Sequence, residues 1–477
     1  MASEAARGFW KDGAIPDALR EALRAYDASP GPGEKIFLAR IYRDAPDLLT
    51  ADRIGLLIEL LTRREIDPSA VSGAGWRYLA RETDLLTAPP PEMARRIAAD
   101  ALVLTLLQED VVAHVGAELA LTAVRRWLLL QGGDFPNLRA ALIAQAALNG
   151  GAWPFDEEER AALAAAEDFA RAYLPPAPHR RAEPAFADPV TRAVAEQYEA
   201  WPYPAWTRIL QGGTRSVAAR LRDLDPSGPD TIATPAEILI AGCGTGRQVA
   251  LWALRAPQDR FTCIDISHAS LGRAEERCAA FGIGNATFRM LDLHDAAALG
   301  RRFDVVMCTG VLHHLPDPEA GWTALAGVLK PGGLMHVMVY SRVGRLRVAA
   351  LRQTLGDIVK GPMSDDTLRE IRRRVLALPP TRTHLRTRDF HSLAGAHDLL
   401  AHRHEDPFDI PRIRRGLDNL GLELIRFELP RQAHRARYRR EHPGDPLQRD
   451  FAAWVQAERD DPGLFTAMYD FWCRKPL

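Results

Sequence analysis

Three glycines stand where the chain could hold a polar, nucleotide-like ligand. They follow an apolar run and precede a helical pattern in EILIAGCGTGRQV (237–249), at Gly242, Gly244 and Gly246. Glycine permits a tight turn and a close approach of a ligand to the backbone, and amide groups at a helix start can face a polar or anionic group. The competing hypothesis is a dinucleotide fold. Its GxGxxG pattern fails in both registers, because Arg247 or Val249 stands where the third glycine belongs.

Two aspartates end the next two apolar runs. Asp265 closes RFTCID (260–265), nineteen residues beyond Gly246, where a carboxylate at a strand's carboxyl end can accept hydrogen bonds from both hydroxyls of a ribose. Asp292, in MLDLHD (290–295), could meet the exocyclic amine of an adenine. The structural alternatives are a cap for the helical stretch after Asp265 and a cap or turn role for Asp292.

A pair of histidines offers acid–base chemistry. His313 and His314 lie in GVLHHLPDP (310–318), just past the apolar run 303–309, at the edge where α/β sheets bind ligands. The pKa of histidine suits removal of a proton from a hydroxyl or a protonated amine. Adjacent side chains diverge, so at most one of the two is expected to act as a base. Alternatively, both cap or pack the following turn.

A second polar cluster, HDLLAHRHEDPFD (397–409), carries three histidines and several carboxylates. A zinc site needs converging ligands, usually four, and on a helix His397 and His402 would point about 140° apart. No metal site is therefore predicted, and the interpretations left open are substrate contact and ordinary surface polarity. The basic stretch RQAHRARYRREHPGD (431–445) favours a solvated face over a patch for nucleic acid or an anionic substrate.

The elements that must position these residues divide the chain in two. Helical patterns fill residues 1–175, at 50–66, 90–110, 117–131, 137–150 and 156–174. A proline-rich linker is expected at 176–189. Short apolar runs at 236–242, 260–266, 286–291, 303–309 and 334–340 then alternate with helices, which predicts an α/β domain over 190–477 with a mostly parallel sheet covered on both faces.

Composition narrows the classes of partner. The 61 Lys and Arg against 62 Asp and Glu give a formal charge of −1, so no global field indicates nucleic acid or anionic lipid. No apolar stretch reaches the roughly 20 residues of a membrane span, and the N-terminus lacks a secretory apolar core, so a cytoplasmic protein without membrane contact is expected. Five cysteines without CxxC spacing predict reduced, buried thiols.

The motifs together resemble a known family. The series ILIAGCGTG, CIDIS, MLDLHD, FDVVMCTGVLHHLPDP and LKPGGLMHVMVY, over about 236–340, is similar in order and spacing to class I S-adenosylmethionine-dependent methyltransferases. QYEAWPYPAW (197–206), the tail with HDLLAHRHEDPFDIPRIRRGLDNLGLELI and the closing MYDFWCRK further resemble a bacterial group in which a helical, often tetratricopeptide-containing region precedes the methyltransferase domain. No clean 34-residue period is visible here, so such repeats are not predicted from the sequence alone.

The resemblance implies a Rossmann-like sheet of seven strands, the last antiparallel, preceded by an all-α domain, with S-adenosylmethionine as cofactor. The backbone of the glycine-rich stretch would wrap the methionine part. Asp265 would hold the ribose and Ile266 would lie against the adenine. The cofactor residues implied are Ala241, Gly242, Cys243, Gly244, Thr245, Gly246, Asp265, Ile266, Asp292, Leu293, Thr309 and Gly310. A helical insertion at about 341–410 departs from the family pattern and leaves the acceptor side open.

The aromatic segment QYEAWPYPAW admits two interpretations. Tyr198, Tyr203 and Trp206 would cover the cofactor or line the acceptor pocket as a lid, or they would form a hydrophobic clasp between the two domains. The acceptor is expected to be an oxygen or nitrogen nucleophile on a small molecule or a protein, and a protein partner could bind the helical domain. The alternative function is a binding or scaffold protein that acts through its helices, which would not need both intact glycines and Asp265.

Overall fold

The computed structural model describes residues 4–174, 186–226, 228, 231–379 and 387–477. Of the linker expected at 176–189, residues 176–185 lie outside the described residues. The chain divides into two compact units, each described separately below. The helical unit comprises residues 1–179, 205–211 and 350–401, and the sheet unit comprises residues 180–204, 212–349 and 402–477.

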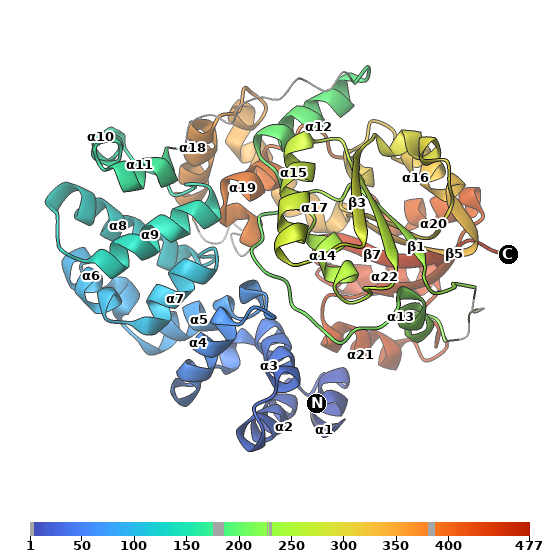
Figure 1. The fold of residues 1–477 in the computed structure, drawn as a ribbon, viewed down its shortest axis with the longest axis horizontal. Coiled ribbons are helices and arrows are strands. Elements are labelled where there is room, and N and C mark those ends of the chain that lie inside the picture. The colour runs from blue at the N-terminus through green and yellow to red at the C-terminus, as the bar shows by residue number, and fades with distance from the viewer. Residues whose placement is uncertain (1–3, 175–185, 227, 229–230, 380–386) are drawn as a thin grey trace. The chain divides into compact units, whose positions relative to one another are not determined.

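The sheet unit contains a seven-stranded sheet in the order β3-β2-β1-β4-β5-β7-β6 (Figure 1). Strands β1 to β5 are parallel, and β7 runs antiparallel to both β5 and β6. This arrangement confirms the predicted α/β fold with seven strands, the last antiparallel. The strands are β1 Glu237–Ala241, β2 Arg260–Asp265, β3 Ala286–Met290, β4 Phe303–Thr309, β5 Leu329–Tyr340, β6 Glu423–Glu428 and β7 Met468–Arg474.

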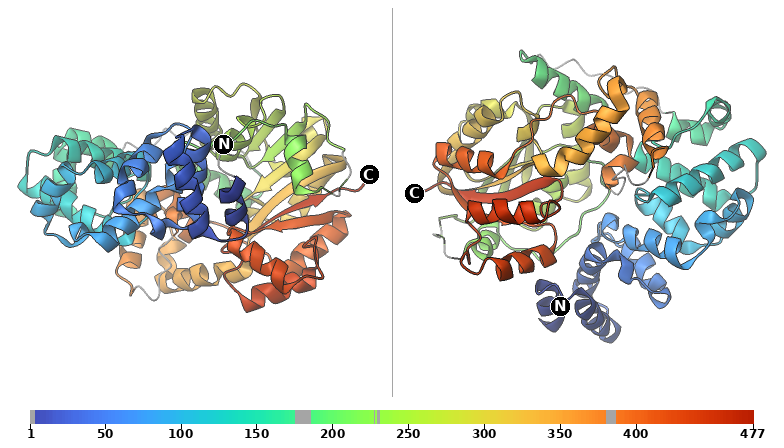
Figure 2. Two further views of the ribbon diagram at one scale, coloured as in Figure 1. Left: turned by 90° about the horizontal axis from the view of Figure 1, so that it is seen from below. Right: turned by 180° about the vertical axis from the view of Figure 1, so that it is seen from behind.

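Helices cover both faces of this sheet, as buried parallel strands require. Helices α14 and α15 pack on one face (Figure 1), and α20 and α22 lie on the other (Figure 2). On the second face the Phe427 ring lies 5.4 Å from the Trp454 ring and 5.7 Å from the Phe471 ring. The helices of this unit are α12 Pro189–Ala200, α13 Val217–Leu224, α14 Arg247–Ala253, α15 His268–Ala280, α16 Pro318–Gly327, α20 Ile410–Leu420, α21 Gln432–Glu441 and α22 Phe451–Asp460.

The helical unit has its own apolar core, formed by buried side chains between Ala6 and Tyr173, most of them on helices. Helices form in all five predicted stretches, but the helix in 50–66 ends at Thr62, the stretch 156–174 is broken at Ala166, and the stretch 90–110 is broken after Ala98. Asp100 accepts hydrogen bonds from the amides of Leu102 and Val103 and so begins a new helix. The helices are α1 Glu4–Lys11, α2 Ile15–Ala28, α3 Pro32–Asp44, α4 Ile54–Thr62, α5 Ser72–Glu82, α6 Pro90–Ala98, α7 Ala101–Glu109, α8 Val115–Gln131, α9 Pro136–Asn149, α10 Glu157–Ala165, α11 Glu167–Tyr173, α18 Asp365–Leu376 and α19 Leu393–Leu400.

The segment expected as an insertion is helical and packs within the helical unit from residue 350 onward. Helix α17 (Arg342–Leu355) leads into it. Buried charges hold it there: Arg372 of α18 donates to Glu118 of α8 at 2.6 Å, and both side chains are fully buried. The second Glu118 oxygen lies 2.6 Å from Nδ1 of His391, which is also fully buried. Burial penalises the charge of Glu118, but these two partners outweigh the penalty and lower its pKa.

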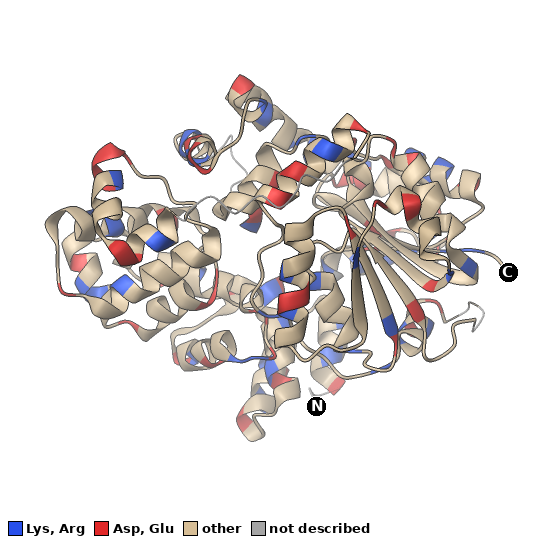
Figure 3. Ribbon diagram, turned by 45° about the horizontal axis from the view of Figure 1, so that its top comes forward, with Lys and Arg blue, Asp and Glu red and all other residues tan. Residues whose placement is uncertain are grey.

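Three further expectations can be compared with the described residues. All five cysteines are free and buried, as predicted. Acidic and basic side chains are interspersed over the elements, in keeping with the near-neutral charge (Figure 3). Among the described residues, no helix combines the length and apolar character that crossing a bilayer demands.

Candidate functional site

Hydrogen bonds to β2 fix the backbone of the glycine-rich loop between β1 and α14. Ala241 ends β1 and is fully buried, and the amides of Gly242 and Cys243 donate to the carbonyl of Ile264 on β2 at 2.8 and 3.0 Å. Gly244 has φ +51°, a left-handed conformation that favours glycine. A Cβ at this position would lie 2.7 Å from the carbonyl oxygen of Tyr203. The loop can therefore stay this close to the aromatic segment only with glycine at 244.

Asp265 lies at the carboxyl end of β2 and faces this loop. One oxygen accepts from the amide of Gly244 at 2.8 Å and the other from the amide of Ser267 at 3.0 Å. Burial raises the pKa of Asp265 despite these hydrogen bonds, and the nearby negative charge of Glu199 raises it further. Ser267, not Asp265, caps α15, by accepting from the amide of Ser270. The alternative interpretation of Asp265 as the cap of that helix is therefore wrong.

The segment before β1 is hydrogen-bonded to the glycine-rich loop and to the start of α15. Thr245 donates its hydroxyl to the carbonyl of Pro204 at 2.5 Å. Glu199 on α12 accepts from the hydroxyl of Ser267 and from the amide of Ala269 at the start of α15, both at 3.0 Å. This role of Glu199 was not predicted from the sequence. Its position as a carboxylate within the aromatic stretch QYEAWPYPAW could have indicated it.

The three aromatic residues predicted to act together belong to different units. Tyr198 and Tyr203 are in the sheet unit, and both are partly exposed. Trp206 is buried and falls in the short segment 205–211 of the helical unit. Next to it, Arg208 donates to Glu109 at 2.5 Å within that unit.

Asp292 and Leu293 follow β3 at the same sheet edge. Asp292 accepts from the amide of His294 at 3.0 Å and lies 2.8 Å from its Nδ1, so it caps the short 3-10 helix Leu293–Leu299. Burial raises the pKa of Asp292, but the hydrogen bonds from His294 outweigh burial and the pKa is lowered. Leu293 is buried in the core. The structure thus shows the capping role that the sequence left as an alternative.

The residues that end β4 lie beside the glycine-rich loop. Thr309 donates to the side-chain oxygen of Gln248 on α14 at 2.9 Å. Gly310 adopts φ +79° and donates its amide to Met338 of β5 at 2.8 Å. A Cβ on Gly242 would overlap the side chain of Val311, which fixes how closely these two loops approach.

His313 and His314 differ sharply in their surroundings. His313 is fully buried, and its Nδ1 accepts from the amide of Tyr340 at 3.1 Å. Burial lowers the pKa of His313 well below 6.5, and the neighbouring His314 and Arg345 lower it further. In His314, Nδ1 lies 2.9 Å from the carbonyl oxygen of His404.

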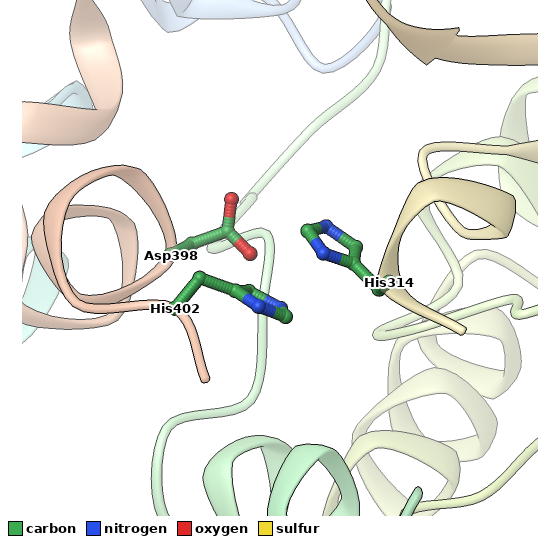
Figure 4. A group of neighbouring side chains, drawn as sticks. All are labelled: His314, Asp398 and His402. Carbon is green, nitrogen blue, oxygen red and sulfur yellow. The ribbon is translucent and has the colours of Figure 1, made fainter. Parts of the chain in front are cut away.

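The second histidine cluster lies directly beside this pair. The amide of Asp406 donates to the carbonyl of His313 at 2.8 Å, and the amide of Phe408 donates to Tyr340 at 2.9 Å. The rings of His402 and His314 stack at 3.6 Å with an angle of 17° (Figure 4). Asp398, also labelled there, lies on α19 in the helical unit. Two motifs about 90 residues apart in sequence are thus joined, which their spacing could not predict.

Comparison with known proteins supports the family. Residues 239–335 match the family model described as a methyltransferase domain. An uncharacterized protein from a Synechococcus species is 33% identical over 264 residues, which cover 51% of this chain and 61% of that protein. A ubiquinone biosynthesis O-methyltransferase from Chromobacterium violaceum is 32% identical over 116 residues, which cover 24% of this chain and 49% of that enzyme. The chain thus spans about half to three fifths of the length of these relatives.

Among solved structures, PKMT2 from Rickettsia typhi in complex with AdoHcy is 16% identical, with a TM-score of 0.40, covering 57% of this chain and 54% of that one. Residues 239–335 of the sheet unit thus match a methyltransferase domain, and the strand order of the sheet is similar to that of class I S-adenosylmethionine-dependent methyltransferases.

Proposed function

We propose that this protein transfers a methyl group from S-adenosylmethionine to an oxygen or nitrogen atom of a small-molecule or protein acceptor. The observation that carries the proposal is the buried carboxylate of Asp265, bonded to the amide of Gly244 in the glycine-rich loop. A buried carboxylate with a raised pKa at a strand's carboxyl end is stabilised by donors such as the two hydroxyls of a ribose.

The residues at this edge fit the cofactor. We place the methionine part of the cofactor against the backbone from Ala241 to Gly246, which packs closely on Val311 and Tyr203 because positions 242 and 244 have no Cβ that would overlap them. Asp265 would hold the ribose, Ile266, Asp292 and Leu293 would lie near the adenine, and Thr309 and Gly310 would line the floor. When bound, S-adenosylmethionine supplies an electrophilic methyl group. The chain must hold the acceptor in line with that group and keep water away from it.

We also propose that residues 198–204 cover the bound cofactor. Residues 198–204 are fastened to the glycine-rich loop through Thr245 and to the start of α15 through Glu199. This supports Tyr198 and Tyr203 as part of a lid over the cofactor. Tyr203→Ala should then lower turnover and leave the thermal midpoint within about 2 °C. A large fall in the midpoint with unchanged turnover would indicate a clasp instead.

Calorimetry with S-adenosylhomocysteine tests cofactor binding directly. Asp265→Asn should weaken binding about 10- to 150-fold, because a charge-assisted hydrogen bond contributes roughly 1.5–3 kcal/mol. Asp304→Asn is the matched control. Asp304 is also buried and accepts a backbone amide, that of Glu237 at 2.8 Å, but lies at the opposite end of the strands. Binding of NAD with no binding of S-adenosylhomocysteine would refute the proposal.

The acceptor is identified by labelling. Lysate from a strain that lacks this protein is incubated with the purified protein and methyl-labelled S-adenosylmethionine, and the macromolecular and small-molecule fractions are counted separately. We propose that the helical unit contributes recognition of the acceptor or of a protein partner. Label in the wild-type reaction that is absent with Asp265→Asn supports the enzyme. Equal label in both would refute it.

A further inference from the structure

Two acidic side chains from distant parts of the sequence meet at the start of α15. Asp265 ends β2, and its Oδ1 accepts from the amide of Ser267 at 3.0 Å. Glu199 comes from α12, and its Oε2 accepts from the hydroxyl of Ser267 and from the amide of Ala269, both at 3.0 Å. One serine of the sheet unit is thus hydrogen-bonded to two carboxylates.

The two carboxylates influence each other through their charge. Burial raises the pKa of Asp265, and the negative charge of Glu199 raises it further. Asp265 is 8% exposed and Glu199 is partly exposed, so water screens this interaction only in part. A charged ligand group beside Asp265 would therefore also interact with Glu199.

The backbone amides at this edge already have acceptors within the protein. Phosphate groups bind to related folds through the amides of a glycine-rich loop and of a helix start. The amides that donate to protein acceptors here are those of Gly242, Cys243, Gly244, Gly246, Ala269 and Ser270. A phosphate would have to displace these acceptors while it lay beside two carboxylates.

Hydroxyl groups suit the same place, because a hydroxyl can donate a hydrogen bond to a carboxylate. A phosphate monoester instead has three strong acceptor oxygens and carries a charge of about −1.5 to −2 at pH 7. Its repulsion by a carboxylate is stronger where water is partly excluded than in bulk water. The chemistry of this edge therefore favours a nucleoside over a nucleotide phosphorylated on its ribose.

Other contacts of α12 hold the helix in place independently of Glu199. The side-chain oxygen of Gln197 accepts from the amide of Arg403 at 3.1 Å. The hydroxyl of Tyr198 lies 3.2 Å from Nε2 of His402. Removing the charge of Glu199 should therefore leave α12 attached to the segment that begins at His402.

We propose that Glu199 is a specificity-determining residue of the cofactor site. Together with Asp265 it admits an adenosine whose ribose hydroxyls are free and repels one that carries a phosphate on either hydroxyl. This deepens the proposed function and rests on it, because the ribose must lie at Asp265. Glu199 acts through its charge, which its hydrogen bonds to Ser267 and Ala269 hold at that end of the site.

Competition against S-adenosylhomocysteine tests the proposal in the full chain. Calorimetry measures the Kd of S-adenosylhomocysteine, and displacement then gives those of adenosine, 2′-AMP and 3′-AMP. In the wild type, adenosine should bind at least about 100-fold more tightly than either phosphate, and Glu199→Gln should lower this ratio about tenfold. The glutamine oxygen can still accept both hydrogen bonds. The ratio does not depend on how strongly a variant binds the adenosine part, which all three competitors share.

Two variants separate charge from shape. Glu199→Asp keeps the charge and should keep the ratio within about threefold of wild type, and added salt should lower the ratio in both proteins more than in Glu199→Gln. Glu196→Gln is the matched control, because it removes the same charge from an exposed position of α12 and should leave the ratio unchanged.

Three results would overturn the proposal: a full wild-type ratio in Glu199→Gln, an equal loss in Glu196→Gln, or equal losses in Glu199→Asp and Glu199→Gln. Each of them is read from proteins that bind S-adenosylhomocysteine. A wild-type protein that does not bind S-adenosylhomocysteine would refute the proposed function instead.

Discussion

Replacing Glu118 by glutamine should destabilise the helical unit strongly. The substitution keeps the shape of the side chain but leaves the guanidinium of Arg372 buried without its counter-charge. Removing one partner of a buried ion pair costs about 3–5 kcal/mol, whereas replacing both by apolar groups can be neutral. For a unit of this size, 1 kcal/mol shifts the thermal midpoint by about 2–4 °C. We therefore expect a fall of roughly 6–20 °C.

Calorimetry and hydrogen exchange measure this loss. Amides of α18 should exchange faster in Glu118→Gln, because Arg372 is anchored there to the carbonyls of Phe390, at 2.7 Å, and Ala152. The effect also depends on pH. The folded-state pKa of Glu118 lies below its ordinary 4.5, so its stabilisation is fully present above that value and is lost as the pH falls toward the folded-state pKa. The difference between wild type and variant should therefore shrink below about pH 4.5.

An exposed ion pair in the same unit provides the control. Arg77 and Asp47 lie 2.8 Å apart, with side chains 43% and 63% exposed. Exposed pairs contribute about 0.2–1 kcal/mol, so Asp47→Asn should shift the midpoint by at most about 4 °C. If Glu118→Gln and Asp47→Asn had the same midpoint and the same exchange in α18, the buried pair would not be what holds this segment.

Two further predictions concern the sheet unit. Gly244→Ala should weaken binding of S-adenosylhomocysteine about tenfold, because the new Cβ would meet the Tyr203 carbonyl. The control is Gly282→Ala: Gly282 also has a positive φ, +73°, but its Cβ would have no atom within 4 Å, so the variant should only lose roughly 1 kcal/mol of stability. Calorimetry on both variants measures the binding. Burial raises the pKa of the Cys243 thiol well above 9.0. Native protein should therefore react with iodoacetamide at Cys243 at least 100-fold more slowly than unfolded protein, as measured by mass spectrometry. Equal rates in the two states would show that this thiol is not buried.

The sheet was predictable because local patterns dictate it. Strands buried on both faces must be continuous apolar runs, and the glycines of the first loop mark where the chain turns into α14. Asp265 followed from the same logic, since it ends one of these runs. The extent of β5 was less clear: it begins at Leu329, five residues before the predicted run, because Lys330 to Gly333 carry little apolar signal.

The partners of the site residues were not predictable from local patterns. His402 lies beside His314 because hydrogen bonds pair residues 406–408 with the ends of β4 and β5, and no periodicity encodes such pairing. The docking of 350–401 depends on single charges, such as Arg372 and His391 meeting Glu118, over 250 positions away in sequence. A charged residue in a helical pattern ordinarily predicts a helix face exposed to solvent. Arg372 and Glu118 are exceptions, because both side chains are buried.

The insertion links the two units through the chain itself. It leaves the sheet unit within α17 and returns to it at His402, the residue that stacks on His314. Between these points Arg372 and His391 are held by Glu118. A loosened α18 would relax the segment that ends at His402, so Glu118→Gln should lower methyl transfer as well as stability below the new midpoint. Asp47→Asn should not, because Asp47 holds no part of the insertion. We therefore expect the helical unit to affect methyl transfer through the segment that leads from α19 to His402.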